Sequence, residues 1–105
     1  MRVLKFVTDK QLLKKDPDCD FSNIAPGTSG YLAAHFKFSD KEWRECVKVA
    51  SFLHNGKEHA VLLEKDACTI PADALAGRKF EVYVIGARPD GYRITSTRTT
   101  VKQEG

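Results

Sequence analysis

The sequence predicts an all-β domain, built as a small antiparallel sandwich or barrel. Three observations predict this fold class: apolar and polar residues alternate along several runs, an Asn-Gly pair separates two apolar runs, and no amphipathic helix of useful length is present. With 105 residues, the chain is long enough to bury one hydrophobic core and too short for a second. We therefore expect a single domain over residues 1–105.

The first part of the chain contains one predicted strand and one long irregular segment. The run RVLKFVT near the N-terminus alternates in the manner of a strand. The segment at about 10–30 has weak periodicity and contains APGTSG. Connections this long are uncommon in compact domains, and they tend to be binding loops or flexible arms. We expect a long loop or arm here, and it is a candidate contact with a partner.

A second strand is predicted over residues 31–38, YLAAHFKF. One face of this run is apolar, and the other, which carries His35, is wetter. Beyond it, Ser39 and Glu42 have the spacing of a capping box, in which the two side chains satisfy free amides at the start of a helical turn. Such a turn would direct Trp43 inward.

An antiparallel hairpin is predicted over residues 46–64. The apolar runs CVKVASFL and EHAVLLE flank the tetrapeptide HNGK. Asn55 and Gly56 both tolerate the positive φ that a type I′ turn requires, and this pair is a strong local signal for a two-residue hairpin loop.

The stretch KDACTIPADALAGRKFEVYVIG predicts a corner between two strands. Cys68 and Ile70 share one face of a short strand, and Pro71 ends it. The residues ADALAG then carry the chain through about one helical turn, with proline at its start and glycine at its end. The alternating run over 79–87 is the clearest strand of the sequence. We expect Cys68 to be buried and unreactive.

The last predicted strand begins at Tyr92 and extends to about Val101, with a break near Ser96. Pro89 and Gly91 suit the turn that joins it to the preceding strand. Together these elements amount to about seven strands with one or two short helical turns, at spacings typical of a sandwich or barrel.

The charge pattern argues against nucleic-acid and membrane partners. The net charge is +3, from 17 Lys and Arg against 14 Asp and Glu, and both signs are mixed along most of the chain. No run approaches the ~20 apolar residues that span a membrane, and the N-terminus lacks the cleavage site of a signal peptide. We expect an intracellular protein that binds neither nucleic acid nor membranes.

Three cysteines, Cys19, Cys46 and Cys68, are widely spaced and odd in number. A disulfide framework needs an even and denser set, so free thiols in a reducing compartment are the better interpretation. A single bridge between Cys46 and Cys68 is left open.

One acidic run has part of the pattern of a calcium loop. Asp16, Asp18 and Asp20 have the spacing of its first three ligands, but Phe21 stands where a glycine is needed and Gly27 where a glutamate should close the site. The same residues are ordinary turn chemistry, and we favour that interpretation.

No other motif indicates catalysis or a bound cofactor. His35, His54 and His59 lack the spacing of metal ligands. There is no G-x-S-x-G elbow, Walker loop or G-x-G-x-x-G sequence. We therefore assign no catalytic, cofactor-binding or metal-binding residues and expect a protein that is not an enzyme.

Aromatic residues leave a small carbohydrate-binding β-sandwich module as the alternative function. Tyr31, Tyr83 and Tyr92 could form a platform for sugar rings if they were exposed together. The more common arrangement places Trp43 in the core and the tyrosines at its margins, with their hydroxyl groups wet.

The order of the motifs FSDKEW, KVASF, a hairpin, CTIPADAL, EVYVIG and GYRITSTRTTVK resembles a known family. It is similar to the immunoglobulin-like domains of tail and baseplate proteins from phages and prophages of Gram-positive bacteria, including the N-terminal domain of baseplate upper proteins. The similarity runs from about Tyr31 to Lys102. It implies an immunoglobulin-like antiparallel β-sandwich with Trp43, Phe52 and Ile70 in the core.

The same resemblance implies a non-enzymatic structural protein of the virion, assembled in the bacterial cytoplasm. Its partners would be other tail, baseplate or fibre proteins, held by protein–protein attachment at sheet edges and by the 10–30 segment. Relatives of this kind often continue into fibre or coiled-coil regions, which leaves a homo-oligomer open. No catalytic residues carry over.

Overall fold

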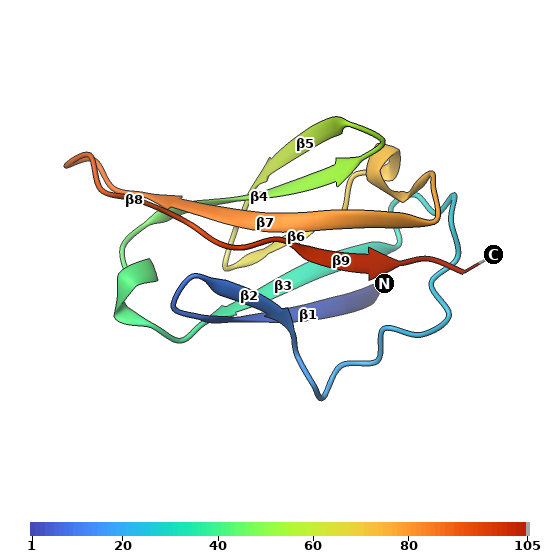
Figure 1. Cartoon of the computed structure of the whole chain (residues 1–105), viewed down its shortest axis with the longest axis horizontal. Helices are drawn as coiled ribbons and strands as arrows, with labels where there is room; N and C mark the ends of the chain where they lie inside the picture. The colour runs from blue at the N-terminus through green and yellow to red at the C-terminus, as the bar shows by residue number, and fades with distance from the viewer. Residues whose placement is uncertain (105) are drawn as a thin grey trace.

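The computed structural model describes residues 1–104, which form two facing β-sheets and contain no α-helix. Sheet 1 has the strand order β2-β1-β3-β6, and sheet 2 has the order β5-β4-β7-β8, with β9 also paired to β7. Figure 1 shows sheet 2 as the upper layer and strands β1 to β3 as the lower layer. Within residues 1–104, no helix is long and apolar enough to cross a membrane. The elements are β1 (Arg2–Asp9), β2 (Leu12–Lys15), β3 (Leu32–Phe38), η1 (Lys41–Trp43), β4 (Val47–His54), β5 (Lys57–Leu62), β6 (Ala67–Thr69), η2 (Ala72–Leu75), β7 (Lys79–Ala87), β8 (Arg93–Thr95) and β9 (Thr99–Lys102).

The all-β, sandwich-like prediction is confirmed, with nine strands in place of about seven. One additional strand, β2, lies inside the expected loop, and the final run divides into β8 and β9, which both pair with β7. The division lies near the predicted break at Ser96. There the Ser96 amide donates to the Val84 carbonyl at 2.9 Å, and the Ser96 hydroxyl accepts from the Val84 amide at 2.9 Å. The two bonds hold the chain against β7 where the pairing register changes.

Strands β1 and β3 are parallel neighbours, a pairing that local sequence patterns do not predict. Phe6 lies opposite Phe36 in this pair, and their rings stack with centroids 5.2 Å apart. Parallel strands need a crossover connection and cannot be joined by a tight turn. The chain between β2 and β3, residues 16–31, makes this crossover without a strand or helix of its own.

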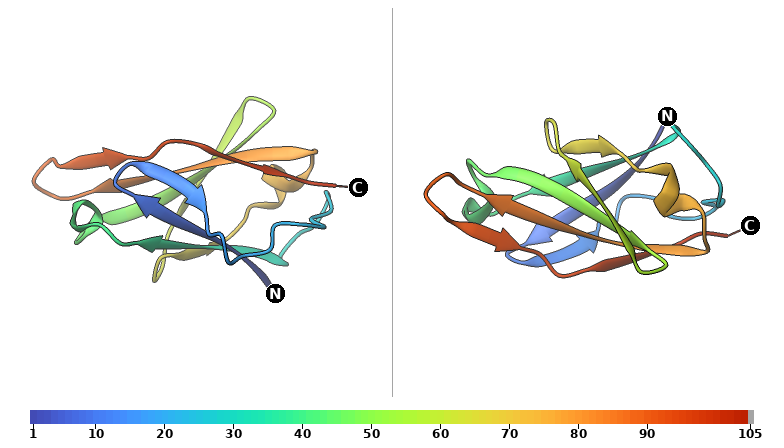
Figure 2. Two further views of the ribbon diagram at one scale, coloured as in Figure 1. Left: turned by 60° about the horizontal axis from the view of Figure 1, so that its bottom comes forward. Right: turned by 90° about the horizontal axis from the view of Figure 1, so that it is seen from above.

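The predicted hairpin is confirmed. Strands β4 and β5 pair antiparallel, and Asn55 (φ 52°) and Gly56 (φ 77°) form the turn between them. Positive φ at both positions is the requirement of a type I′ turn. The left-hand view of Figure 2 shows the tip of this hairpin projecting beyond the rest of sheet 2.

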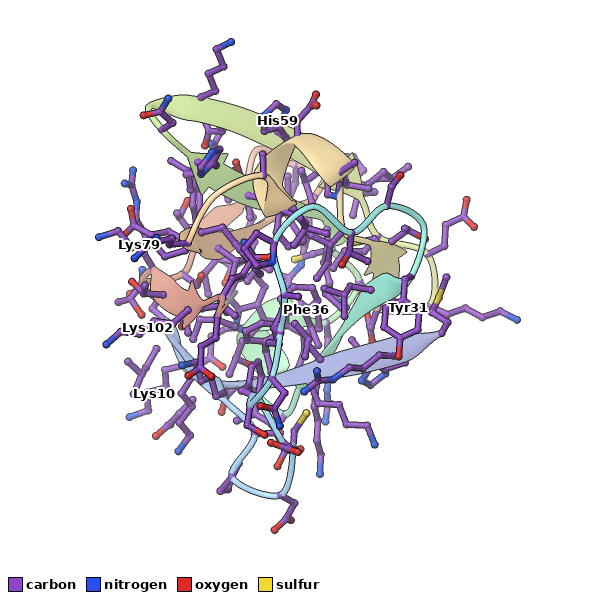
Figure 3. The ribbon with its side chains drawn as sticks, turned by 90° about the vertical axis from the view of Figure 1, so that its right-hand side faces the viewer. Lys10, Tyr31, Phe36, His59, Lys79 and Lys102 are labelled. Atoms are coloured by element: carbon purple, nitrogen blue, oxygen red, sulfur yellow. The ribbon has the colours of Figure 1, made fainter. Side chains whose placement is uncertain are left out.

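The core lies between the two sheets. Figure 3 shows Phe36 in the interior and Lys102 pointing outward. Trp43, Phe52 and Ile70, which the family resemblance implies as core residues, are all buried. The rest of the buried apolar set is Leu4, Phe6, Leu13, Ile24, Leu32, Ala34, Ala50, Ala74, Leu75, Phe80, Val82, Val84, Ile94 and Val101.

The expected long loop at 10–30 is shorter than predicted, because Leu12–Lys15 forms β2. The crossover that follows is held against the sandwich at several points. The Arg2 guanidinium donates to the carbonyls of Asp20 and Ser22 at 2.9 and 2.6 Å. Ile24 is buried, and its carbonyl accepts from the Glu104 amide at 2.7 Å. These contacts make the segment a fixed part of the domain surface.

The turn that carries Trp43 forms, but the predicted capping box is wrong. The N-cap residue of η1 is Asp40 and no side chain caps the turn. Ser39 therefore lies one residue before the N-cap and Glu42 is the second residue of the turn, which puts the pair out of register for a capping box. The Asp40 carboxylate instead accepts from the Lys10 amide at 2.5 Å. The Trp43 indole donates to the Lys10 carbonyl at 2.8 Å. The β1–β2 turn is thereby joined to η1.

The corner after β6 follows the prediction in most respects. Strand β6 ends at Thr69, Pro71 is the N-cap of η2, and β7 begins at Lys79. Ile70 is buried. Cys68, which we expected to be buried, is half-buried, because β6 is the outermost strand of sheet 1 and its thiol borders a surface hollow.

Candidate functional site: the open edge of β5

On one side of the sandwich, hydrogen bonds join the edge of β2 in sheet 1 to the segment of sheet 2 that runs from β8 to the start of β9. The Thr97 amide donates to the Gln11 carbonyl at 2.8 Å, and the Thr97 hydroxyl accepts from the Leu13 amide at 3.1 Å. The Thr99 hydroxyl donates to the Leu13 carbonyl at 2.6 Å. The Gln11 side chain donates to the Thr95 carbonyl at 3.0 Å. These bonds occupy backbone groups of β2 that a further strand would need.

The opposite side begins with β6, whose edge is largely occupied. The Ile70 amide donates a hydrogen bond to a carbonyl of β3. Because bonded and non-bonded pairs alternate along an antiparallel ladder, the backbone groups of Ala67 and Thr69 point away from β3. Those of Ala67 are already paired with Glu64, at 3.0 and 3.1 Å. Pro71 has no N–H to offer. Thr69 alone presents both backbone groups over this stretch.

Strand β5 is the outer strand of sheet 2 on that same side, and its edge is open. The Leu63 amide donates to the Lys48 carbonyl at 2.9 Å, which sets the alternation of the β4–β5 ladder. The amides and carbonyls of Glu58, Ala60 and Leu62 therefore point away from β4. No other strand of residues 1–104 pairs with β5. Three alternate residues of β5 can thus form backbone hydrogen bonds with a further strand.

An apolar row lies beside this open edge on the outer face of sheet 2. Leu62 pairs with Val49, and Val49 pairs with Ile85, so the three side chains are neighbours across three strands. In the next row Val47 pairs with Ala87. Leu62 and Val47 are 57% and 62% exposed. An apolar row of this kind next to an unpaired edge favours contact with another polypeptide.

Glu58, nearer the hairpin tip, is oriented by two hydroxyl groups. Its Oε1 accepts from the Ser51 hydroxyl at 2.7 Å and from the Tyr83 hydroxyl. The bonds from Tyr83 and then Ser51 lower the pKa of the Glu58 carboxyl below its ordinary value of 4.5. The same bond raises the pKa of Tyr83, because an ionised tyrosine could no longer donate. Arg98 lies over the Tyr83 ring, 5.5 Å from its centroid.

Acid should weaken the attachment of β5 to sheet 2. Since the Glu58 pKa is lower folded than unfolded, the ionised carboxylate stabilises the fold above pH 4.5, and this contribution is lost as the pH falls through the lowered pKa. We expect wild-type protein to lose more stability than Glu58→Gln between neutral and acidic pH. Urea unfolding followed by circular dichroism measures the difference, with Glu104→Gln as the control. Parallel acid profiles of the wild type and Glu58→Gln would contradict the prediction.

The histidines and the aspartates of the calcium-loop-like run do not gather into one cluster, although His54 and His59 border the same surface hollow. His35 lies exposed on the outer face of sheet 1, as predicted for the wetter face of its strand. Figure 3 shows His59 on β5 beside η2. The Asp16 carboxylate accepts from the Asp18 amide at 2.9 Å, in agreement with turn chemistry. Within residues 1–104 no group of three His, Cys, Asp or Glu side chains could hold a metal ion.

The three cysteines are free thiols in the structure, and Cys46 and Cys68 do not form the bridge that the sequence left open. Both are partly buried against the core. Burial raises the pKa of the Cys68 thiol to about 11. A thiol with this pKa is almost entirely protonated at neutral pH, and the protonated form is a poor nucleophile.

The three tyrosines of the carbohydrate-binding alternative lie on different elements. Tyr31 precedes β3 and is 52% exposed. Tyr83 is on β7 and has Arg98 over its ring. Tyr92 precedes β8, donates to the Glu42 carbonyl at 2.9 Å and has a guanidinium 4.2 Å from its ring centroid. Two of the three rings are therefore stacked with arginine, which leaves less ring surface for a sugar.

Sequence reasoning did not identify Glu58, Ala60 and Leu62 as a site. The signal that was available is the alternation in EHAVL directly after the Asn-Gly turn, with no proline to interrupt it. A scan of the chain against models of protein families finds no match, and searches of curated proteins and of solved structures find none either. Membership of the phage tail family therefore stays a prediction from the order of the motifs.

Proposed function

We propose that this protein is a non-enzymatic attachment module of a phage or prophage tail or baseplate. In this proposal it is an immunoglobulin-like β-sandwich that holds another tail, baseplate or fibre protein at the open edge of β5. The observation that carries the proposal is the unpaired edge of Glu58, Ala60 and Leu62 beside an exposed apolar row. The ordered motifs from Tyr31 to Lys102 support the tail assignment.

An added strand would gain both backbone hydrogen bonds and apolar contact at this edge. Main-chain bonds supply much of the affinity in strand addition, and side-chain pockets supply the specificity. Isolated edge strands are commonly protected by charges, proline or bulges, because an open edge invites aggregation. The stretch from Ala60 to Leu62 carries no charge, proline or bulge, and Glu58 is the one charged residue of the outward-pointing triad. A partner strand that is permanently bound at this edge would account for the absence of such protection.

On the side of the sandwich that carries β5, the edge of sheet 1 is a poor site for an added strand. Strand β6 offers few free backbone groups, whereas β5 offers three residues in phase. On the far side of the sandwich, Thr97 and Thr99 occupy the outward backbone groups of Leu13 on β2. A partner strand would therefore extend sheet 2 and leave sheet 1 unchanged.

Incorporation into particles provides the test. In the bacterium that carries the gene, the tagged chain is expected in purified phage or tail particles, where immunogold electron microscopy should place it on the tail. Ala60→Pro should abolish incorporation, since proline removes the central outward amide without breaking a bond to β4. Ala60→Ser keeps the amide and should incorporate normally.

Circular dichroism and thermal melts of both variants must match the wild type for this comparison to hold. If wild-type chain is missing from every purified particle, the tail function is wrong. If Ala60→Pro folds and incorporates as well as Ala60→Ser, the β5 edge is not the point of attachment.

A further inference from the structure

We infer that the segment bound at β5 is an antiparallel strand of a different protein, with an aliphatic residue, a large apolar residue and a basic residue at alternate positions. From its N-terminus these residues would lie opposite Leu62, Ala60 and Glu58. This inference rests on the proposed function and names the chemistry of the partner.

The direction of the strand follows from sheet 2. Every pairing in this sheet is antiparallel. An antiparallel strand at the open edge forms closely spaced bond pairs with Glu58, Ala60 and Leu62, whose backbone groups point outward. The partner residues at these positions direct their side chains to the outer face of sheet 2, because opposed residues in a sheet share a face.

The surroundings of Glu58 favour a basic residue at the facing position of the added strand. Its carboxylate is fixed by the Ser51 and Tyr83 hydroxyls through Oε1, and Oε2 has no hydrogen bond in the structure. No salt bridge to Glu58 is formed within residues 1–104. Its neighbour on β4 is Leu53, which carries no charge. Arg98, whose charge also lowers the Glu58 pKa, lies over the Tyr83 ring and forms its salt bridge with Glu81 instead. A lysine or arginine on an added strand would lie directly opposite this carboxylate, as opposite charges favour.

Ala60 and Leu62 call for apolar residues. Ala60 pairs with Ser51, so two small side chains lie next to each other on the outer face. A large side chain opposite Ala60 can cover the exposed Ala60 methyl group, whereas Ser51 is already buried and bonded to Glu58. A residue opposite Leu62 extends the apolar row that continues through Val49 and Ile85. An aliphatic residue there would be covered on one side by the Leu62 side chain.

A second copy of this chain fits the edge poorly. In a two-fold antiparallel pairing centred on Ala60, Glu58 lies opposite Leu62 of the second copy. The diagonal neighbour of Glu58 is then Glu64 of that copy, a like charge. The pairing would therefore leave Glu58 without a basic partner and close to another acid, which disfavours the homo-oligomer at this edge.

The probe is the peptide SVTFTRS, in which Val, Phe and Arg are designed to face Leu62, Ala60 and Glu58. Titration into the ¹⁵N-labelled full chain, followed by NMR, should shift the amide signals of Glu58, Ala60 and Leu62. The charge-reversed peptide SVTFTES should bind about threefold more weakly, which is the scale of an exposed ion pair. Glu58→Gln should remove the difference between the two peptides.

N-methylation of the peptide provides the matched control, since it leaves the protein unchanged. Methylation of the Phe nitrogen should abolish binding, because this N–H faces the Ala60 carbonyl. Methylation of the Thr nitrogen before it should have little effect, because that N–H points away from β5. Equal loss from both methylations, or binding without shifts on β5, would overturn strand addition.

Three further results would each overturn the inference. These are equal affinity for the Arg and Glu peptides, no binding of SVTFTRS, and a dimer of the free chain that Ala60→Pro dissociates in analytical ultracentrifugation. None of them bears on whether the chain is found on tail particles. Failure of the inference and failure of the proposed function are therefore distinguishable.

Discussion

Replacing Trp43 with alanine should lower the free energy of unfolding by about 4 kcal/mol, as expected for truncation of a large buried aromatic residue. The Trp43 side chain is fully buried and lies 5.0 Å from the Phe38 ring, centroid to centroid. Its indole also donates to the Lys10 carbonyl at 2.8 Å, which joins η1 to the β1–β2 turn. The substitution opens a cavity and leaves that carbonyl without its partner.

Urea unfolding followed by far-ultraviolet circular dichroism measures this loss, since Trp43 is the single tryptophan and its fluorescence disappears with it. For a domain of this size the melting temperature should fall by about 15–20 °C. Trp43→Phe should retain part of the packing and lie between the two. A loss of stability below about 1 kcal/mol for Trp43→Ala would contradict the central packing role of the ring.

Adding a single methyl group at Gly86 should cost about 2 kcal/mol, although glycine in a strand interior usually weakens the strand. A Cβ at this position would lie 3.1 Å from Cys46 Cβ, 3.1 Å from Trp43 Cε3 and 3.2 Å from Ile94 Cγ2. The first two contacts cannot relax easily, because one is the first atom of a side chain and the other belongs to the buried indole. The surrounding backbone must therefore move.

A double-mutant cycle separates this overpacking from a general strand effect. Trp43→Phe removes the atom at Cε3, so Gly86→Ala should cost less in that background than in the wild type. Chemical denaturation of the four proteins gives the coupling free energy. Additive losses would show that the new methyl group does not clash with the indole.

Both substitutions act on the part of the core that η1 covers, whereas attachment is assigned to β5. Trp43 belongs to η1, a Cβ at Gly86 would meet Trp43 and Cys46, and the open edge begins at Glu58. A variant that loses stability but still carries an intact β5 should bind SVTFTRS whenever it is folded. Comparing Gly86→Ala with Ala60→Pro therefore separates loss of fold from loss of the docking edge.

Features decided by neighbouring residues were predictable. The type I′ turn at Asn55 and Gly56 depends on two residues that tolerate positive φ, and the structure has both. Alternation identified the strand over 79–87, because side chains of a strand point to opposite faces in turn. The break near Ser96 was also visible in the sequence. The capping box at Ser39 and Glu42 failed because the turn begins one residue later, after Asp40, whose carboxylate binds the amide of a residue far away in the chain, Lys10.

The sequence by itself determined the all-β class, the β4–β5 hairpin and the inward position of Trp43, since these follow from side-chain period, turn chemistry and hydrophobicity. Tertiary structure alone decided the parallel pairing of β1 with β3 and the choice of β5 as the open edge. Whether Ala60 presents its amide to β4 or to solvent depends on ladder phase and strand order. The phase follows from the two-residue turn at Asn55 and Gly56, which the sequence predicts, whereas the strand order is set by contacts between residues distant in sequence, which no local pattern encodes.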